Sequence, residues 1–117
     1  MKLDLSQYKI HLVVCPVDMR QGFRGLSLIA EACLGIDVGK CADCVVFVSS
    51  RRLTCKAIWC DSRGCSLLSR NLKTGRFAKF LARSQDEDAQ VISVEELMTF
   101  LDGGSLQCER TGFGQKV

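Results

Sequence analysis

Apolar residues recur at the spacing of one helical face in two parts of the chain. In the first part they are Met19, Phe23, Leu26, Ala30 and Cys33. Asp18 precedes this stretch, and Gln21 comes three residues after Asp18, an arrangement that resembles a capping box. Gly35 supplies a helix stop. The pattern predicts a helix over residues 19–34. Gly22 falls beside its apolar stripe, which indicates close contact with a neighbouring backbone.

The second helical pattern is shorter and lies near the C-terminus. Its apolar positions are Val94, Leu97, Met98 and Leu101, which follow i, i+3, i+4, i+7 spacing. Ser93 and Glu96 form a capping box in front of it, and Gly103 is the natural C-cap. We expect a short helix near residues 94–102.

The remaining apolar segments are short and suit β-strands. They cover residues 10–14, 44–48, 54–61, 65–72, 76–80 and 89–92. In the third of these, Cys55, Ala57 and Trp59 alternate with Lys56, Ile58 and Cys60. Turn residues separate successive strands, which favours an antiparallel meander over βαβ units. We therefore predict an α+β fold, with an antiparallel sheet of about five strands, the long helix packed across one face and a short C-terminal helix.

The length of 117 residues suits one domain. We place a single α+β domain at residues 1–103 and, because the following residues are glycine-rich and aperiodic, a flexible tail at 104–117. No apolar run approaches the roughly 18 residues needed to cross a bilayer, and the first residues lack the apolar core of a signal peptide. We expect a cytoplasmic protein that does not contact membranes.

Positive charge is concentrated in one part of the chain. Nine basic residues lie between Arg51 and Arg83 with Asp61 as the one acid, so this basic block is net +8 and the remainder is net −5. Such a block favours a polyanionic partner, nucleic acid above all, over a merely solvated face. The predicted contacts to phosphate are Arg51, Arg52, Lys56, Arg63, Arg70, Lys73 and Arg76, which lie at strand ends, turns and alternate strand positions. Several of them would project from one sheet face or rim.

Eight cysteines raise the question of a metal site or a disulfide framework. Cys41, Cys44, Cys60 and Cys65 give C-x2-C-x15-C-x4-C, which approaches zinc-ribbon spacing, although the second pair is too widely spaced for a standard knuckle. Buried, reduced thiols are the competing interpretation. We favour that interpretation and expect neither zinc, nor a disulfide, nor any other cofactor to be required for folding.

An ordered set of motifs carries a family resemblance. The motifs are Val17-Asp18-Met19-Arg20, Gly22-Phe23, Gly25-Leu26, Phe47-Val48, Arg51-Arg52, Lys56-Ala57-Ile58-Trp59, Asp61, Gly64 and Gly75-Arg76-Phe77. Over roughly residues 10 to 80 the chain resembles the small accessory protein, often labelled TnpB, encoded by the second open reading frame of the sixty-six family of bacterial insertion sequences. The resemblance implies a protein that accompanies a separate transposase on a mobile element.

The chain also departs from that family at specific positions. Cys60 follows Trp59 where the family usually has a second aromatic residue, and Cys65 replaces an aromatic residue after the glycine. Asn71 follows Arg70 where a basic pair is usual, which leaves one fewer charge. These departures suggest a core repacked with small thiols.

Catalysis is not expected from these residues. A nuclease or transposase needs acidic residues that converge on a divalent metal, and the motifs supply Asp18 and Asp61, which a helix cap and a turn explain. His11 has no acid nearby in the sequence to orient it. Trp59 could stack on a base, but the face that it shares with small apolar residues favours burial.

Two functions remain open at this point. The first is a non-catalytic accessory protein of an insertion-sequence transposition system that binds DNA weakly through a basic sheet face. The alternative is a scaffold that docks on the transposase through the apolar and acidic C-terminal helix around Glu95 and Glu96, without contacting DNA itself. The expected partners are therefore DNA and the transposase.

Overall fold

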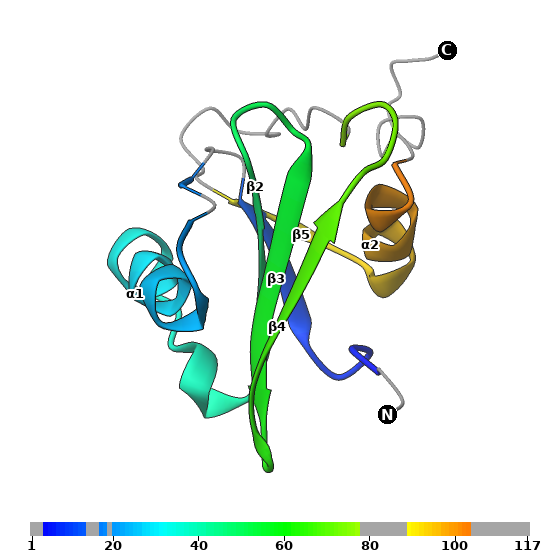
Figure 1. The fold of residues 1–117 in the computed structure, drawn as a ribbon. Coiled ribbons are helices and arrows are strands. Elements are labelled where there is room, and N and C mark those ends of the chain that lie inside the picture. The colour runs from blue at the N-terminus through cyan, green and yellow to red at the C-terminus, as the bar shows by residue number, and fades with distance from the viewer. Residues whose placement is uncertain (1–3, 14–16, 19, 78–88, 104–117) are drawn as a thin grey trace.

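A computed structural model describes residues 4–13, 17–18, 20–77 and 89–103, and places two helices on opposite faces of a five-stranded sheet (Figure 1). In chain order the elements are β1 (Lys9–Val13), α1 (Phe23–Leu34), the 3-10 helix η1 (Val38–Lys40), β2 (Asp43–Val48), β3 (Thr54–Asp61), β4 (Gly64–Asn71), β5 (Ala89–Ile92) and α2 (Val94–Leu101). The predicted α+β class is confirmed. Among the residues described, no helix has the length and apolar character needed to cross a membrane.

The sheet is mixed, and the expectation of a wholly antiparallel meander was wrong. The strand order is β4-β3-β2-β1-β5. β2, β3 and β4 form the expected antiparallel meander, but β1 pairs with β2 in parallel, and β5 returns antiparallel to β1. A parallel pair needs a crossover of a dozen residues or more, and the segment containing α1 and η1 between β1 and β2 supplies it.

Both faces of the central strands are buried. Cys55, Ala57 and Trp59 of β3 belong to the core on the α2 side, whereas Ile58 and Cys60 belong to the core on the α1 side. The predicted alternation along β3 is thus confirmed. Leu26 and Ala30 cover the second core from α1, and Leu97, Phe100 and Leu101 cover the first from α2.

The start of α1 differs from the prediction. The helix begins at Phe23 after Gly22, whose extended backbone makes it the N-cap, with no side chain capping the helix. Asp18 instead accepts hydrogen bonds from the Arg20 backbone and side chain, and Gln21 N donates to Asp18 O at 3.2 Å, which closes a turn before the helix. A Cβ on Gly22 would meet nothing within 4 Å, so the inferred close backbone contact is also wrong.

The C-terminal helix follows its sequence signals more closely. Ser93 Oγ accepts from Glu96 N at 3.0 Å and Glu96 Oε1 accepts from Ser93 N at 2.8 Å, which confirms the capping box. Asp102 is the C-cap, and Gly103 follows it with φ of 87°. The cap is therefore one residue earlier than predicted.

The strand predicted at 76–80, the tail predicted at 104–117 and the first predicted strand have different outcomes in the structure. Arg76 and Phe77 lie outside any strand, so the strand expected at 76–80 does not begin there, and residues 78–80 fall outside the described part of the chain. The tail expected at 104–117 also falls outside the described residues. At the first strand, the prediction of residues 10–14 corresponds to β1, and residue 14 is not described.

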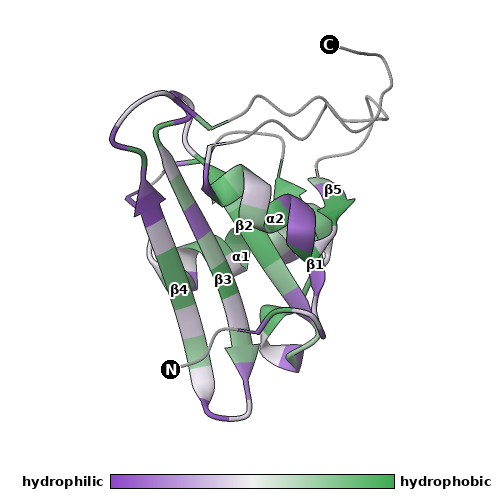
Figure 2. Ribbon diagram, turned by 90° about the vertical axis from the view of Figure 1, so that its right-hand side faces the viewer, coloured by the Kyte–Doolittle hydropathy of each residue, from purple (hydrophilic) through white to green (hydrophobic). Residues whose placement is uncertain are grey.

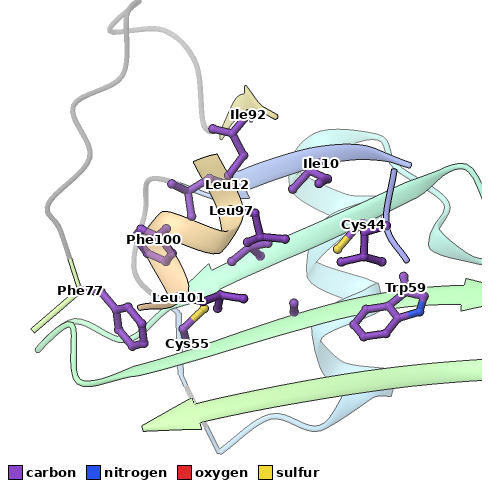
Figure 3. Packing of buried hydrophobic residues seen from close by; sticks show 13 residues of the cluster. Ile10, Leu12, Cys44, Cys55, Trp59, Phe77, Ile92, Leu97, Phe100 and Leu101 are labelled. Atoms are coloured by element: carbon purple, nitrogen blue, oxygen red, sulfur yellow. The ribbon is translucent and has the colours of Figure 1, made fainter. Parts of the chain in front are cut away.

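Phe77 ends the described segment after β4 and is buried completely. Its ring stacks on Phe100 of α2, with ring centroids 5.1 Å apart and an interplanar angle of 22° (Figure 3). Phe77 N also donates to Arg52 O at 2.7 Å. One aromatic side chain therefore joins the loop after β4 to α2, while its backbone joins that loop to the β2–β3 turn.

Replacing Phe77 with alanine should lower the free energy of unfolding by about 3–5 kcal/mol, because the substitution removes a buried ring and leaves a cavity. Chemical denaturation of the full chain measures this loss. Leu28→Ala is the control: its side chain is 59% exposed, so its effect should stay within about 0.5 kcal/mol. Equal losses in the two variants would contradict the anchoring role of Phe77.

Candidate nucleic-acid interface

The turn between β2 and β3 is held by Ser49. Its backbone N donates to Thr54 O at 2.9 Å, and its Oγ accepts from the backbone N of Leu53 and of Thr54, both at 3.2 Å. Arg52 N donates to Ser49 O at 2.9 Å, and Arg52 has a left-handed φ of 59°. These bonds fix a tight turn that exposes Arg51 and leaves Arg52 half-buried.

The loop after β4 lies against this turn. Leu72 N donates to Leu53 O at 3.0 Å, and Phe77 N donates to Arg52 O. Between these two anchors the chain turns at Gly75, whose φ is 73°, and leaves Lys73 and Arg76 exposed. Two backbone hydrogen bonds therefore bring both basic segments to the same end of the sheet.

We call Arg51, Arg52, Lys73 and Arg76 the cationic rim. In Figure 2 hydrophilic colour marks two places: the end of β4, at the same end of the sheet as the rim, and the β3–β4 turn, at the opposite end. Much of β1, β2 and β3 between these two ends is hydrophobic. Within the described residues, no carboxylate forms an ion pair with any of the four. Four cations without a described counter-charge favour binding of an anion at this rim.

The other three predicted contacts do not join the rim. Lys56 lies on the α1 face, where its Nζ donates to Gln21 O at 2.9 Å. Arg63 lies in the β3–β4 turn, at the end of β3 opposite to the cationic rim. The eight residues of β3 that separate the two ends span about 26 Å. The seven residues therefore do not share one sheet face.

Arg70 is directed to the α2 side and contacts the end of that helix. Its Nη1 donates to Leu101 O at 3.3 Å and lies 3.7 Å from Asp102 Oδ1. A guanidinium at a helix C-terminus satisfies an unpaired carbonyl and opposes the negative end of the helix dipole. Sequence reasoning missed this structural role because the partner lies 31 residues away.

The residues considered for catalysis are held in local structure. Asp61 Oδ1 accepts from Arg63 N at 2.9 Å and from Gly64 N at 3.1 Å, as a turn aspartate does. His11 does have an acidic partner, since its Nε2 lies 2.8 Å from Asp43 Oδ1. The parallel pairing of β1 with β2 brings these two together, and no signal in the local sequence reveals it.

Trp59 is 5% exposed and packs in the core on the α2 side. Its ring faces the interior with Cys55 and Ala57, as the alternation of β3 predicts. A base could not reach it without opening this core, so stacking on nucleic acid is excluded for the folded chain.

The four cysteines of the zinc-like pattern do not converge. Cys44 lies in the core on the α2 side, and Cys60 lies in the core on the α1 side. Within the described ranges, no three His, Cys, Asp or Glu side chains form a group that could hold a metal ion. Burial raises the pKa of Cys44 and of Cys55 to about 12, which disfavours the thiolate form that binds metal.

Protein purified under reducing conditions should therefore contain well below one equivalent of zinc per chain, and a chelator should leave its thermal unfolding curve unchanged. Elemental analysis and calorimetry measure these two quantities. One tightly held zinc ion per chain, with a loss of stability on chelation, would show that the cysteines converge in solution.

Asp18 is held as a carboxylate by Arg20. The Arg20 side chain, and then its backbone N–H, donate hydrogen bonds that lower the pKa of Asp18 from 3.8 to about 2. Because the folded-state pKa is the lower one, the interaction favours the folded state above pH 3.8. That contribution is lost as the pH falls toward about 2.

The pKa of Asp18 should rise in Arg20→Ala but stay below 3.8, since the backbone donor of residue 20 remains. A pH titration of the Asp18 carboxyl signal by NMR measures the shift. Arg24→Ala removes an exposed arginine of α1 and should leave the pKa unchanged. An equal rise in both variants would attribute the lowered pKa to general charge instead of this contact.

Comparison with known protein families gives a match. The family model described as IS66 Orf2 like protein matches residues 8–111. No curated protein and no solved structure matches this chain.

Proposed function

This chain belongs to the IS66 Orf2-like family and acts in insertion-sequence transposition, and from that premise we propose that it is a non-catalytic accessory protein that binds DNA weakly through phosphates. The observation that carries the proposal is the cationic rim. Its four side chains extend from two segments that backbone hydrogen bonds hold together. The DNA of a bacterial element lies in the cytoplasm, which we take as the protein's location.

Two features of the rim support contact with phosphates. Arg51, Lys73 and Arg76 are exposed, so they can reach a DNA backbone without unfolding the domain. They extend from the β2–β3 turn and from the loop after β4, which two backbone hydrogen bonds hold at one end of the sheet. Contacts of this kind position a protein on DNA without reading its sequence.

The arrangement of the acidic residues supports a role without catalysis. Asp18 and Asp61 are engaged in separate turns, and Asp43 is paired with His11 on the sheet. Cleavage of a phosphodiester by metal ions would need such carboxylates around one point. We therefore propose that the transposase performs the chemistry.

A second function has its own supporting observation. On and beside α2, Met98 and Val91 are 40% and 46% exposed, and Glu95 is exposed as well. This mixed apolar and acidic surface suits a scaffold that docks on the transposase. Both functions can hold together, because α2 and the cationic rim present different side chains.

DNA binding should weaken steeply with salt, and the steepness should depend on the rim. The combined variant Arg51→Ala, Lys73→Ala and Arg76→Ala should lower the slope of log affinity against log salt by roughly 0.9 per lost phosphate contact, up to about 2.7. Arg52 is retained because its left-handed backbone and its carbonyl hold the turn. Fluorescence anisotropy with a labelled duplex, from about 50 to about 200 mM salt, measures the slope.

The matched control removes the same number of charges at the other end of the sheet. Lys9→Ala, Lys40→Ala and Arg63→Ala replace exposed residues at the start of β1, at the end of η1 and in the β3–β4 turn. This variant should keep the wild-type slope. An equal fall in both variants would attribute binding to net charge, and no binding by the wild type at low salt would reject DNA binding.

A pulldown separates DNA binding from docking. The tagged chain is incubated with the transposase of its element, with and without terminal-repeat DNA. Capture that requires the DNA and fails for the rim variant supports the first function. Capture without DNA that persists in high salt supports the scaffold, since apolar contacts are not screened.

A further inference from the structure

Two thiols face each other across the β3–β4 hairpin. Cys60 lies directly opposite Cys65 in the register, and their Sγ atoms are 3.1 Å apart. We propose that this pair is a reversible modification site, at which a small disulfide oxidises the two thiols to a disulfide within the chain. The proposal does not depend on DNA binding.

The hairpin already has the geometry that a disulfide requires. Residues directly opposite in an antiparallel pair have Cα atoms about 4.5–5.5 Å apart, within the range of about 4.4–6.8 Å found in disulfides. The sulfur atoms must approach by about 1 Å to reach the bond length of about 2.05 Å. Closure therefore needs small side-chain rotations and no change of strand register.

The pair is also open to a small reagent. Cys65 is exposed, whereas Cys60 is 5% exposed. Both residues line a shallow cavity of about 210 Å³ between α1, η1 and the hairpin, with Phe23, Ile36 and Val38 also in its wall. A small disulfide can thus reach the Cys65 sulfur from solvent, and the Cys60 sulfur lies directly behind it.

The order of the two chemical steps follows from the hydrogen bond between the thiols. The Cys60 S–H donates to Cys65 Sγ, and burial, together with this bond, raises the pKa of Cys60. Cys65 is the exposed thiol and therefore attacks first: it loses its proton to solvent, breaks the S–S bond of the reagent and releases one thiolate. The released thiolate takes the proton of Cys60. Cys60 then attacks Cys65 Sγ and expels the second thiolate, which takes up a proton equivalent to the one that Cys65 lost. Two protein thiols and one disulfide thus become one protein disulfide and two small thiols.

The other described cysteines lack this arrangement. Cys44 and Cys55 are buried. Cys33 and Cys41 are exposed, but no sulfur lies within hydrogen-bond distance of either among the described residues. Cys60 and Cys65 are consequently the pair expected to close under mild oxidation.

Tryptic mapping tests the proposal directly, because trypsin cleaves after Arg63, between the two cysteines. The reduced full chain is treated with glutathione disulfide at mildly alkaline pH, and remaining thiols are then alkylated and the chain is digested. We expect peptides 57–63 and 64–70 joined, two hydrogens lighter than their sum. The mixed disulfide at Cys65 should be resolved faster than it forms and should not accumulate, whereas the one at Cys33 should persist, since only Cys65 has a second thiol held in place. A reducing agent should separate the joined peptides again.

Two variants complete the test. Cys65→Ser changes an exposed side chain and should abolish the joined peptides, whereas Cys33→Ser, also exposed, should leave their yield unchanged. Native folding of both is checked by circular dichroism. Three outcomes would overturn the proposal. The first is a stable glutathione adduct at Cys65 without closure, and the second is a bond from Cys60 or Cys65 to another cysteine. The third is an equal yield of the joined peptides when the chain is oxidised in concentrated guanidinium chloride.

Discussion

Burial of β2 and β3 on both faces is the constraint on which the rest of the molecule depends. Val45, Phe47 and Ile58 must be covered on one side, and Val46, Ala57 and Trp59 on the other. A helix on each face meets this requirement, with α1 supplied by the crossover between β1 and β2 and α2 by the chain after β5 (Figure 1). A purely antiparallel meander with one helix would leave one of these faces in water, at a cost of roughly 25 cal/mol for each Å² of apolar surface.

The same constraint decides where the positive charges can lie. A cation inside either core would lose its hydration without a partner, so the basic residues of the β2–β4 segment are restricted to turns, to the sheet ends and to positions where a carbonyl accepts a hydrogen bond. Lys56 and Arg70 take the last option, with Gln21 O and Leu101 O as their acceptors. The strong positive charge of this segment therefore gives a rim at one end of the sheet rather than a basic face.

Local signals in the sequence were sufficient for much of this arrangement. Thr54–Asp61 was predicted with its bounds and its two faces, and Ser93 and Glu96 identified the start of α2, because alternation and capping depend on neighbouring residues. The parallel pairing of β1, the His11–Asp43 contact and the Arg70–Leu101 contact were not predictable in this way, since each joins segments far apart in the chain. For the candidate site, the residue types were predicted, but only Arg51, Arg52, Lys73 and Arg76 come together.

The two ends of β3 are chemically independent for a structural reason. The cationic rim is built on the β2–β3 turn, and the two thiols lie beside the β3–β4 turn, with the ladder from Thr54 to Asp61 between them. The eight residues of β3 span about 26 Å, and closing the disulfide needs only side-chain rotations at one end of the strand. Bond formation between Cys60 and Cys65 preserves the register of that ladder, so the turn that presents Arg51 and Arg52 keeps its conformation. Oxidation of the two thiols would therefore change the binding of a partner that contacts the β3–β4 turn or the cavity beside α1. It would leave the binding of phosphates by the cationic rim unchanged.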